Sequence, residues 1–391
     1  METSRKVFNN EQGIIMVISL LILALLIGAG VGAIVSMQTD FRTSGNFKTG
    51  TQAFDLADAG IEWAKQQVKK AGTNPPNPSG DTKTLSPGSF TVSFSNATKE
   101  SQLVGYVTVT STGTVGNSTA TITASIKKTY ELSDGAISMR GAEAGAAFTG
   151  NSFAVDGKDY TTAGTLVSGA KQQYGITVPN STLDSQVTSA VAGQQTDNII
   201  GKGGTQPNIE QSDFMPSAEM SQLASDLCSQ SNAVVQNVPG GGTLDVPTGQ
   251  TWGTAASPVL YCINGLTTSA TDKVDFQGNF TGAGILVVKN ANVEINGAWH
   301  WEGLILVSGN NVGFKVAGGG NKDIFGSIMI NETNTDSPVE VDLQGAVNVY
   351  YSSAALRTAI SQFTSSQNPL SAVYDSLPST ISQSYWRMVS N

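Results

Sequence analysis

The sequence predicts an α+β protein that is mostly β: a long N-terminal helix packed on a small antiparallel sheet, followed by a β-solenoid domain with a partly helical insertion. Three observations predict this class. An apolar run over 14–35 is long enough to cross a bilayer as a helix. Within 73–132, residues 89–95 and 105–128 alternate Thr or Ser with Val, Ile or Ala, the pattern of half-buried antiparallel strands. Short apolar segments then return, each after a glycine, at intervals of about 20 residues.

The apolar run begins directly after Gly13, behind a short polar leader that carries Arg5 and Lys6. A secretory signal would be cut after its apolar core, and that core is usually shorter than this one. An uncut signal anchor is a second interpretation. Cleavage on the cytoplasmic side, between Gly13 and Ile14, is a third, and the polar leader over 1–13 suits it best.

Beyond the membrane, the same helix carries a stripe of apolar residues that repeat every seven positions. The large row is Phe47, Phe54, Ile61 and Val68, and the small row is Gly50, Ala57, Ala64 and Ala71. The stripe is either the face that docks on the protein's own sheet or a seam for neighbouring helices. Because a proline-rich segment follows at 74–80, we expect the helix to span 14–72.

Two stretches of this helix resemble one known family. Gly13–Leu21 starts an apolar helix directly after a glycine, and the second stretch reads Ala57, Asp58, Ala59, Gly60, Ile61 and Glu62. Both resemble the N-terminal module of PilX-type minor pilins of type IV pili. The resemblance implies cleavage after Gly13 by a prepilin peptidase and N-methylation of Ile14. It also implies a single inner-membrane span before assembly, then a place in an extracellular pilus beside the major pilin and other minor pilins. The inner-membrane assembly platform is the remaining implied partner.

One position departs from the family pattern. Most major pilins carry Glu at the fifth mature residue, where it neutralises the terminal amine of a neighbouring subunit, and here that position is Ile18. A buried ammonium without a partner costs several kcal/mol, so a subunit that lacks the Glu is poorly suited to the shaft. The hypothesis is a place at the filament tip or in an initiating complex. The alternative is that the Glu was lost without consequence for position.

Three glycines, Gly28, Gly30 and Gly32, lie near the end of the apolar run. Each costs about 1 kcal/mol of helix stability relative to Ala, so we expect a locally softened helix, by analogy with pilin filaments. Gly28 and Gly32 also form a G-x-x-x-G pair that would let another helix approach closely. That pair is weak evidence, because such pairs are common in glycine-rich membrane helices.

The glycines that open the repeated segments are Gly284, Gly303, Gly326 and Gly345. Second short strands lie between them, and this self-similarity predicts stacked solenoid coils over 133–353. We expect an insertion over about 160–270 that contains a helix at Ala218–Leu227. The tail, 354–391, is predicted to cap the last coil, because a terminal coil exposes unpaired edges.

Composition favours an exported, weakly charged protein. Charged residues make up 13% of the chain, the net charge is −9, and no basic tract indicates nucleic acid. Cys228 and Cys262 are the only cysteines, and outside the cytoplasm such a pair is expected to form a disulfide. No cofactor is expected, and two spaced thiols with one histidine make a zinc site improbable.

Candidate catalytic groups are sparse, although parallel β-helices do host polysaccharide lyases and hydrolases. Asp156 and Asp159 could contribute to a Ca²⁺ site, but capping of turns is the simpler interpretation. His300 lies between Trp299 and Trp301, which either stack on a sugar or pack in the protein. The sequence therefore predicts a non-enzymatic minor pilin of a type IV pilus or related pseudopilin filament, displaying a domain for adhesion or surface contact. The alternative is a membrane-anchored β-helix protein that binds or cleaves polysaccharide.

Overall fold

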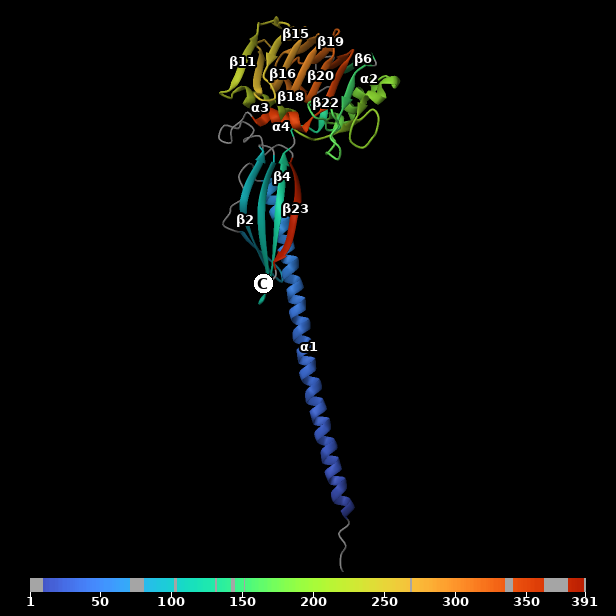
Figure 1. Ribbon diagram of the computed structural model, residues 1–391, viewed down its shortest axis with the longest axis vertical. Coiled ribbons are helices and arrows are strands. Elements are labelled where there is room, and N and C mark those ends of the chain that lie inside the picture. Colours follow the sequence, from blue (N-terminus) through green and yellow to red (C-terminus); the bar gives the residue numbers. More distant parts are fainter. Residues whose placement is uncertain are drawn as a thin grey trace, which may run out of the picture.

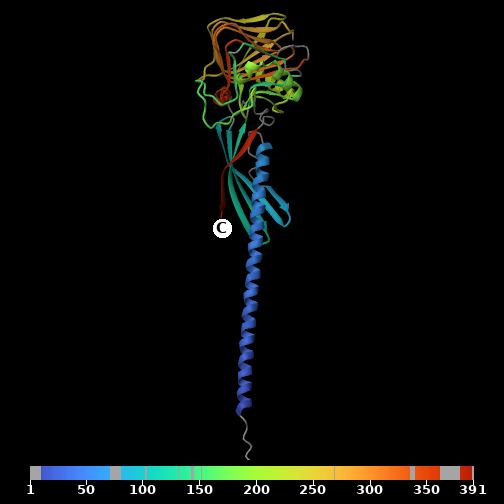
Figure 2. The same ribbon diagram turned by 90° about the vertical axis from the view of Figure 1, so that its right-hand side faces the viewer.

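The computed structural model describes residues 10–70, 81–101, 104–130, 132–141, 145–150, 152–267, 269–334, 340–361 and 379–389. A long helix carries an antiparallel sheet along its upper part, and a domain of parallel sheets lies beyond that sheet (Figure 1). The view turned by 90° shows the same order along the long axis (Figure 2). The two β parts have separate hydrophobic cores, so each part is stabilised by its own apolar burial.

The helix α1 (Asn10–Lys70) is continuous over 61 residues. Its C-terminal part buries one face on the antiparallel sheet, because small and apolar residues recur at helical spacing. These buried residues are Ala53, Leu56, Ala57, Ile61, Ala64 and Val68. Docking on the protein's own sheet therefore accounts for most of the seven-residue stripe, whereas Phe47 is 78% exposed. The predicted end at Gly72 lies just outside the described residues.

The antiparallel sheet has the strand order β1-β2-β3-β4-β23 in the described residues. Its strands are β1 (Asp81–Leu85), β2 (Gly88–Ser101), β3 (Val104–Val115), β4 (Ser118–Tyr130) and β23 (Ser379–Val389). The predicted alternation is confirmed, since Val107 and Val109 are buried while Thr108 and Thr110 are not. A two-residue turn joins β3 to β4, and Gly116 supplies its positive φ of 57°.

The C-terminal strand does not follow the expectation of a cap. β23 pairs antiparallel with β4, with Ser379 opposite Tyr130, so the chain returns to the first sheet. The whole parallel domain is thus inserted between two neighbouring strands of the antiparallel sheet. By pairing with β4, β23 satisfies the backbone hydrogen-bonding groups at the edge of the antiparallel sheet. A polar tail with a high β propensity is suited to this place.

The parallel domain contains two sheets that share one core. The larger sheet comprises β5 (Gly135–Met139), β7 (Ala154–Asp156), β8 (Tyr174–Val178), β9 (Ile199–Ile200), β10 (Ile209–Gln211), β11 (Ala233–Val238), β13 (Gln250–Trp252), β14 (Val259–Gly265), β16 (Phe280–Lys289), β18 (Trp299–Gly309), β20 (Lys322–Glu332) and β22 (Val347–Tyr351). The smaller sheet comprises β6 (Ala146–Thr149), β12 (Thr243–Val246), β15 (Lys273–Gln277), β17 (Asn292–Asn296), β19 (Phe314–Ala317) and β21 (Val341–Gln344). From β14 to β22, successive strands alternate between the two sheets.

Three of the four predicted glycines align across this sheet. Gly284 lies opposite Gly303, and Gly303 lies opposite Gly326, all with φ between 131° and 142°. A Cβ on Gly303 would lie 2.0 Å from the backbone oxygen of Gly284, so the position requires glycine. Gly345 does not continue this row, because Tyr351 occupies the position opposite Gly326. Gly345 lies instead in the turn between β21 and β22, so this glycine is not equivalent to the other three, although the strands predicted around it are present.

The predicted insertion over about 160–270 is largely part of the parallel domain. Strands β8 to β14 from this range join the two sheets. The range also holds the helices α2 (Ser181–Ala190) and α3 (Ser217–Cys228) and the 3₁₀ helix η1 (Gly193–Asn198). The helix expected at Ala218–Leu227 is confirmed as α3. With α4 (Ser353–Ser361), α3 packs on the larger sheet. The outward residues in the C-terminal half of strands β18 and β20 are therefore buried, and the polar Asn331 among them bonds to Ser217 and Ser221 of α3.

A buried ion pair lies where the chain enters the parallel domain. Arg140 donates from Nη2 to Asp134 Oδ2 at 2.7 Å and from Nε to the backbone oxygen of Phe214 at 2.6 Å. Asp134 also accepts hydrogen bonds from the hydroxyls of Ser138 and Thr177. Burial lowers the pKa of Arg140, and the neighbouring carboxylate opposes that effect. The network fixes β5 and β8 at the start of the domain.

Candidate functional site

The first half of α1 exposes an apolar surface on every side. Ile14 is 58% exposed, Ile18 is 53% exposed and Val35 is 57% exposed. The described part of the chain contains one helix that is long and apolar enough to cross a membrane, with a mean hydropathy of 3.0 over its most apolar window. A helix that is apolar all round and has no protein around it is suited to lipid or to a bundle of similar helices.

The predicted processing position lies in the first turns of this helix. Gly13 and Ile14 fall within α1, as does Ile18, the position that the sequence analysis identified by its missing Glu. Gly28, Gly30 and Gly32 are also helical, and a Cβ at any of them would meet nothing within 4 Å. The fold thus places these residues on one continuous helix, while cleavage and helix softening stay predictions.

The family motif lies where α1 meets the antiparallel sheet. Ala57 and Ile61 are buried, Ala59 is half-buried, and Asp58 and Glu62 face solvent. Gly60 allows the closest approach, since a Cβ there would lie 2.1 Å from Ser111 Oγ on β3. Glu62 also forms an ion pair with Lys65, one helical turn away, at 2.5 Å. In this chain the motif therefore packs the helix on its own sheet.

The cysteine pair forms the predicted disulfide. Cys228 ends α3 and Cys262 lies in β14, with a Cα–Cα distance of 5.6 Å. The bond closes a loop with a sequence separation of 34 residues, and it attaches α3 to the larger sheet. An even pair of thiols, in a chain that its sequence predicts to be exported, was sufficient to predict it.

Both calcium candidates serve as local acceptors. Asp156 accepts from the backbone N–H of Lys158 and from the Tyr160 hydroxyl, at 2.8 and 2.6 Å. Asp159 accepts from the backbone N–H and the hydroxyl of Ser353, which begins α4. The two carboxylates therefore hold a turn and a helix start, as the capping interpretation predicts.

The two tryptophans beside His300 face the core. Trp299 is 2% exposed and Trp301 is fully buried, and their ring centroids lie 5.9 Å apart. Neither ring is available to stack on a sugar, so packing is the correct interpretation. His300 alternates with them and faces outward, with Nε2 3.1 Å from Glu302 Oε1.

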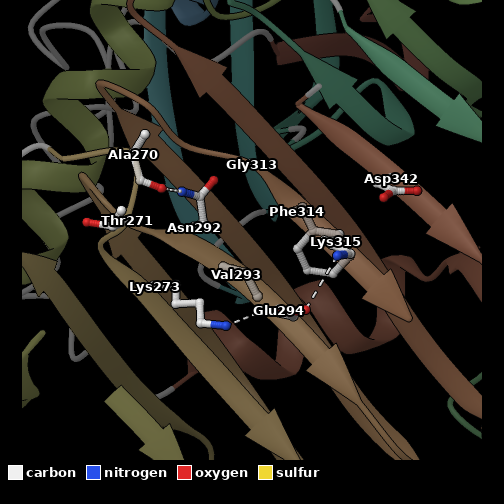
Figure 3. A pocket seen from close by; sticks show the side chains of 10 residues that line it. All are labelled: Ala270, Thr271, Lys273, Asn292, Val293, Glu294, Gly313, Phe314, Lys315 and Asp342. Atoms are coloured by element: carbon white, nitrogen blue, oxygen red, sulfur yellow. Dashed lines mark hydrogen bonds and ion pairs between the residues drawn. The ribbon is translucent and has the colours of Figure 1, made fainter. Parts of the chain in front are cut away.

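A pocket of about 470 Å³, with charged side chains in its lining, lies on the outer face of the smaller sheet (Figure 3). Lys273 Nζ is 2.8 Å and Lys315 Nζ 3.5 Å from opposite oxygens of Glu294. The hydrogen bond from Lys273 lowers the pKa of Glu294, and the same bond raises the pKa of Lys273. Asp342 lines the other side of the pocket, where its Oδ2 accepts a hydrogen bond from Gln344.

Sequence reasoning missed this pocket and the network around Arg140. The outward residues of the pocket were visible as single charges inside short apolar strands, such as Glu294 between Val293 and Ile295. That pattern shows which residues point outward, but it does not show which strands are neighbours. The pairing of Glu294 with Lys273 and Lys315 could therefore be found only from the parallel register of the sheet.

No family model and no curated protein matches the chain. Among solved structures, it is similar to the competence-associated pilin ComZ from Thermus thermophilus at 11% sequence identity. The match covers 87% of this chain and 97% of that chain, with a TM-score of 0.23. A score this low carries no argument about function, so the functional proposal depends on the geometry above.

Proposed function

We propose that the chain is a non-enzymatic minor pilin of the PilX type, in a type IV pilus or a related pseudopilin filament. The observation that carries the proposal is the division of α1. One half is apolar and exposed all round, and the other half is packed on the protein's own antiparallel sheet. The exposed half would lie in the inner membrane before assembly and in the filament afterwards, so assembly would exchange lipid contacts for helix contacts.

The leader supports processing by a prepilin peptidase. Gly13 stands directly before the apolar residues, and the basic residues precede it, as cleavage on the cytoplasmic side requires. In this proposal Ile14 becomes the methylated N-terminus. The partners are then the major pilin, other minor pilins and the inner-membrane assembly platform.

Ile18 supports a place at the tip or in the initiating complex. An isoleucine cannot neutralise the terminal amine of a neighbour, so the shaft would leave a charge without a partner. At the tip the subunit needs no such neighbour on one side. The inserted parallel domain, which lies at the far end of the molecule from the exposed part of α1, would then face outward (Figure 1).

We also interpret the parallel domain as a β-solenoid that is displayed for surface contact. The alternation of strands between two sheets and the aligned glycines are what stacked coils would produce. Its entry and exit lie side by side on β4 and β23, which lets a large domain be carried by a small sheet.

The test of processing compares two bulky substitutions in the same apolar segment. Gly13→Leu should leave residues 1–13 attached, whereas Gly30→Leu should still be cut after Gly13, because only the first alters the cleavage position. Intact mass and N-terminal sequencing of the wild-type protein from sheared filaments should give a methylated Ile14. A protein of mature size from the Gly13→Leu variant would contradict the proposal.

The test of position uses immunogold labelling of filaments against the parallel domain. Label should lie at filament ends in the wild type. Ile18→Glu supplies the missing carboxylate and should move part of the label into the shaft. Label scattered along wild-type shafts would refute the tip assignment while leaving the minor pilin assignment intact.

A further inference from the structure

On the outer face of the larger sheet, solvent exposure differs between the two sides of the aligned glycines Gly284, Gly303 and Gly326. Beyond them, α3 and α4 cover the sheet, and Gly303 lies close enough to α4 that a Cβ would be 3.1 Å from Ala359 Cβ. On the N-terminal side of these glycines, several outward side chains remain partly accessible. His300 has a side-chain exposure of 36% and Glu302 of 20%, and Thr281 is exposed.

The parallel register arranges these outward side chains in two rows across the strands. His300, Asp323 and Asn348 are opposite one another in the first row. Glu302, Phe325 and Tyr350 are opposite one another in the second row. We call this set the outer strip, and its residues are His300, Glu302, Asp323, Phe325, Asn348 and Tyr350.

Aromatic rings run across the outer strip without a break. The Phe325 ring lies 5.6 Å from the His300 ring on one side and 5.6 Å from the Tyr350 ring on the other, by their centroids. Tyr160 extends the row, 4.7 Å from Tyr350. Phe325 is 6% exposed and forms the floor, while the two tyrosines are half-buried. Burial and the hydrogen bond to Asp156 raise the pKa of Tyr160, so its hydroxyl stays protonated.

Carboxylates border these rings. Asn348 Nδ2 donates to Asp323 Oδ1 at 2.7 Å, and Glu302 Oε1 lies beside His300. Asp323 Oδ2 and Glu302 Oε2 receive no hydrogen bond from the part of the chain that the structure describes, and both side chains are accessible to solvent. The outer strip therefore offers the partly exposed rings of His300 and Tyr350, supported by the buried Phe325, next to hydrogen-bond acceptors of negative charge.

We propose that the outer strip binds a neutral oligosaccharide. A sugar ring packs its C–H face on the accessible parts of the His300 and Tyr350 rings, and its hydroxyls donate to the neighbouring carboxylates. The negative charge of Glu302 and Asp323 disfavours anionic glycans, because a second carboxylate would have to be brought close to the first. The inference rests on the proposed display of this domain and names the ligand class of the contact surface.

The experiment measures binding to the full-length protein purified in detergent. The probes are the neutral hexasaccharides of glucose, mannose and N-acetylglucosamine, with hexagalacturonate as the anionic comparison. Binding is measured by isothermal titration calorimetry. At least one neutral probe should bind with a Kd below about 1 mM, and hexagalacturonate should bind at least tenfold more weakly.

Three variants locate the site. His300→Ala and Tyr350→Ala should each weaken binding of the neutral probe about tenfold. Lys315→Ala, on the outer face of the smaller sheet, should leave it within twofold. Glu302→Gln keeps the shape of the side chain and removes its charge. It should therefore reduce the difference in Kd between the neutral probe and hexagalacturonate. Because Tyr350 packs between two rings, its variant is scored only if its unfolding temperature equals that of the wild type. If the Tyr350 variant is destabilised, His300→Ala alone decides the result.

Several results would overturn the inference. The first is that every neutral probe has a Kd above about 1 mM. The others are that His300→Ala leaves the Kd of the neutral probe unchanged, or that hexagalacturonate binds more tightly than the neutral probes. The outcome for the proposed function is separate, because it depends on the N-terminus. A processed, filament-borne protein that binds no neutral probe would leave the minor pilin proposal standing and remove this one. An unprocessed protein that binds through the outer strip would do the reverse.

Discussion

The aligned glycines of the parallel domain provide the sharpest test of its strand register. In Gly303→Ala, the new Cβ would lie 2.0 Å from the Gly284 oxygen, whereas ordinary contacts begin at 3.4 Å. β18 would have to move by about 1.4 Å away from β16 to accept the methyl group. The residue would also keep a φ of 136°, which L-residues other than glycine avoid.

The magnitude follows from these two effects. A residue held in an unfavourable φ region costs about 1–3 kcal/mol. Lengthening two or three ladder hydrogen bonds costs about 1 kcal/mol each. We therefore expect the free energy of unfolding of the parallel domain to fall by about 3–6 kcal/mol, or its Tm by roughly 6–24 °C for a domain of this size.

The assay is urea unfolding of the full-length protein in detergent, followed by tryptophan fluorescence. Trp252, Trp299 and Trp301 lie in the parallel domain and report on its core. Gly319→Ala is the matched control, because a Cβ there meets nothing within 4 Å and the substitution should change stability by less than about 0.5 kcal/mol. If Gly303→Ala unfolds within that same margin of the wild type, the register of β16 and β18 is wrong.

Three further predictions concern the disulfide, the buried ion pair and the pocket. Replacing Cys228 and Cys262 together by Ser should lower the stability of the parallel domain by about 3–4 kcal/mol, measured by the same unfolding experiment; an unchanged midpoint would mean that the loop is constrained without the bond. Asp134→Asn should cost about 3–5 kcal/mol because it leaves Arg140 buried without its carboxylate, whereas Asp197→Asn on the surface should be nearly neutral; equal effects would argue against the ion pair. The pKa of Glu294 lies below its ordinary value of 4.5, so its interactions stabilise the fold above that pH and are lost as pH falls through the lowered pKa. Glu294→Gln should therefore flatten the decline of Tm between about pH 5 and pH 3, and an identical decline in both proteins would refute this.

Local pattern in the sequence was enough for several parts of the protein. The apolar run and the small residues of α1 gave a long helix with one docking face, because side chains three and four apart share a face of a helix. Alternation gave β2, β3 and β4, because a strand exposes every second residue. Two cysteines in a chain predicted to be exported indicated the disulfide, and repeated glycines indicated three aligned strands of the larger sheet.

Contacts between distant residues were decided only by the tertiary structure. The pairing of β23 with β4 joins residues that lie on either side of the whole parallel domain, and local pattern carries no information about such a partner. Gly345 shares the local pattern of the other glycines, yet it lies in the turn between β21 and β22, whereas the other three lie inside strands of the larger sheet. The outer strip and the Lys273–Glu294–Lys315 cluster arise in the same way, because each is built from side chains of adjacent parallel strands. A strand determines which of its residues point outward, but only the sheet determines which strands lie beside it.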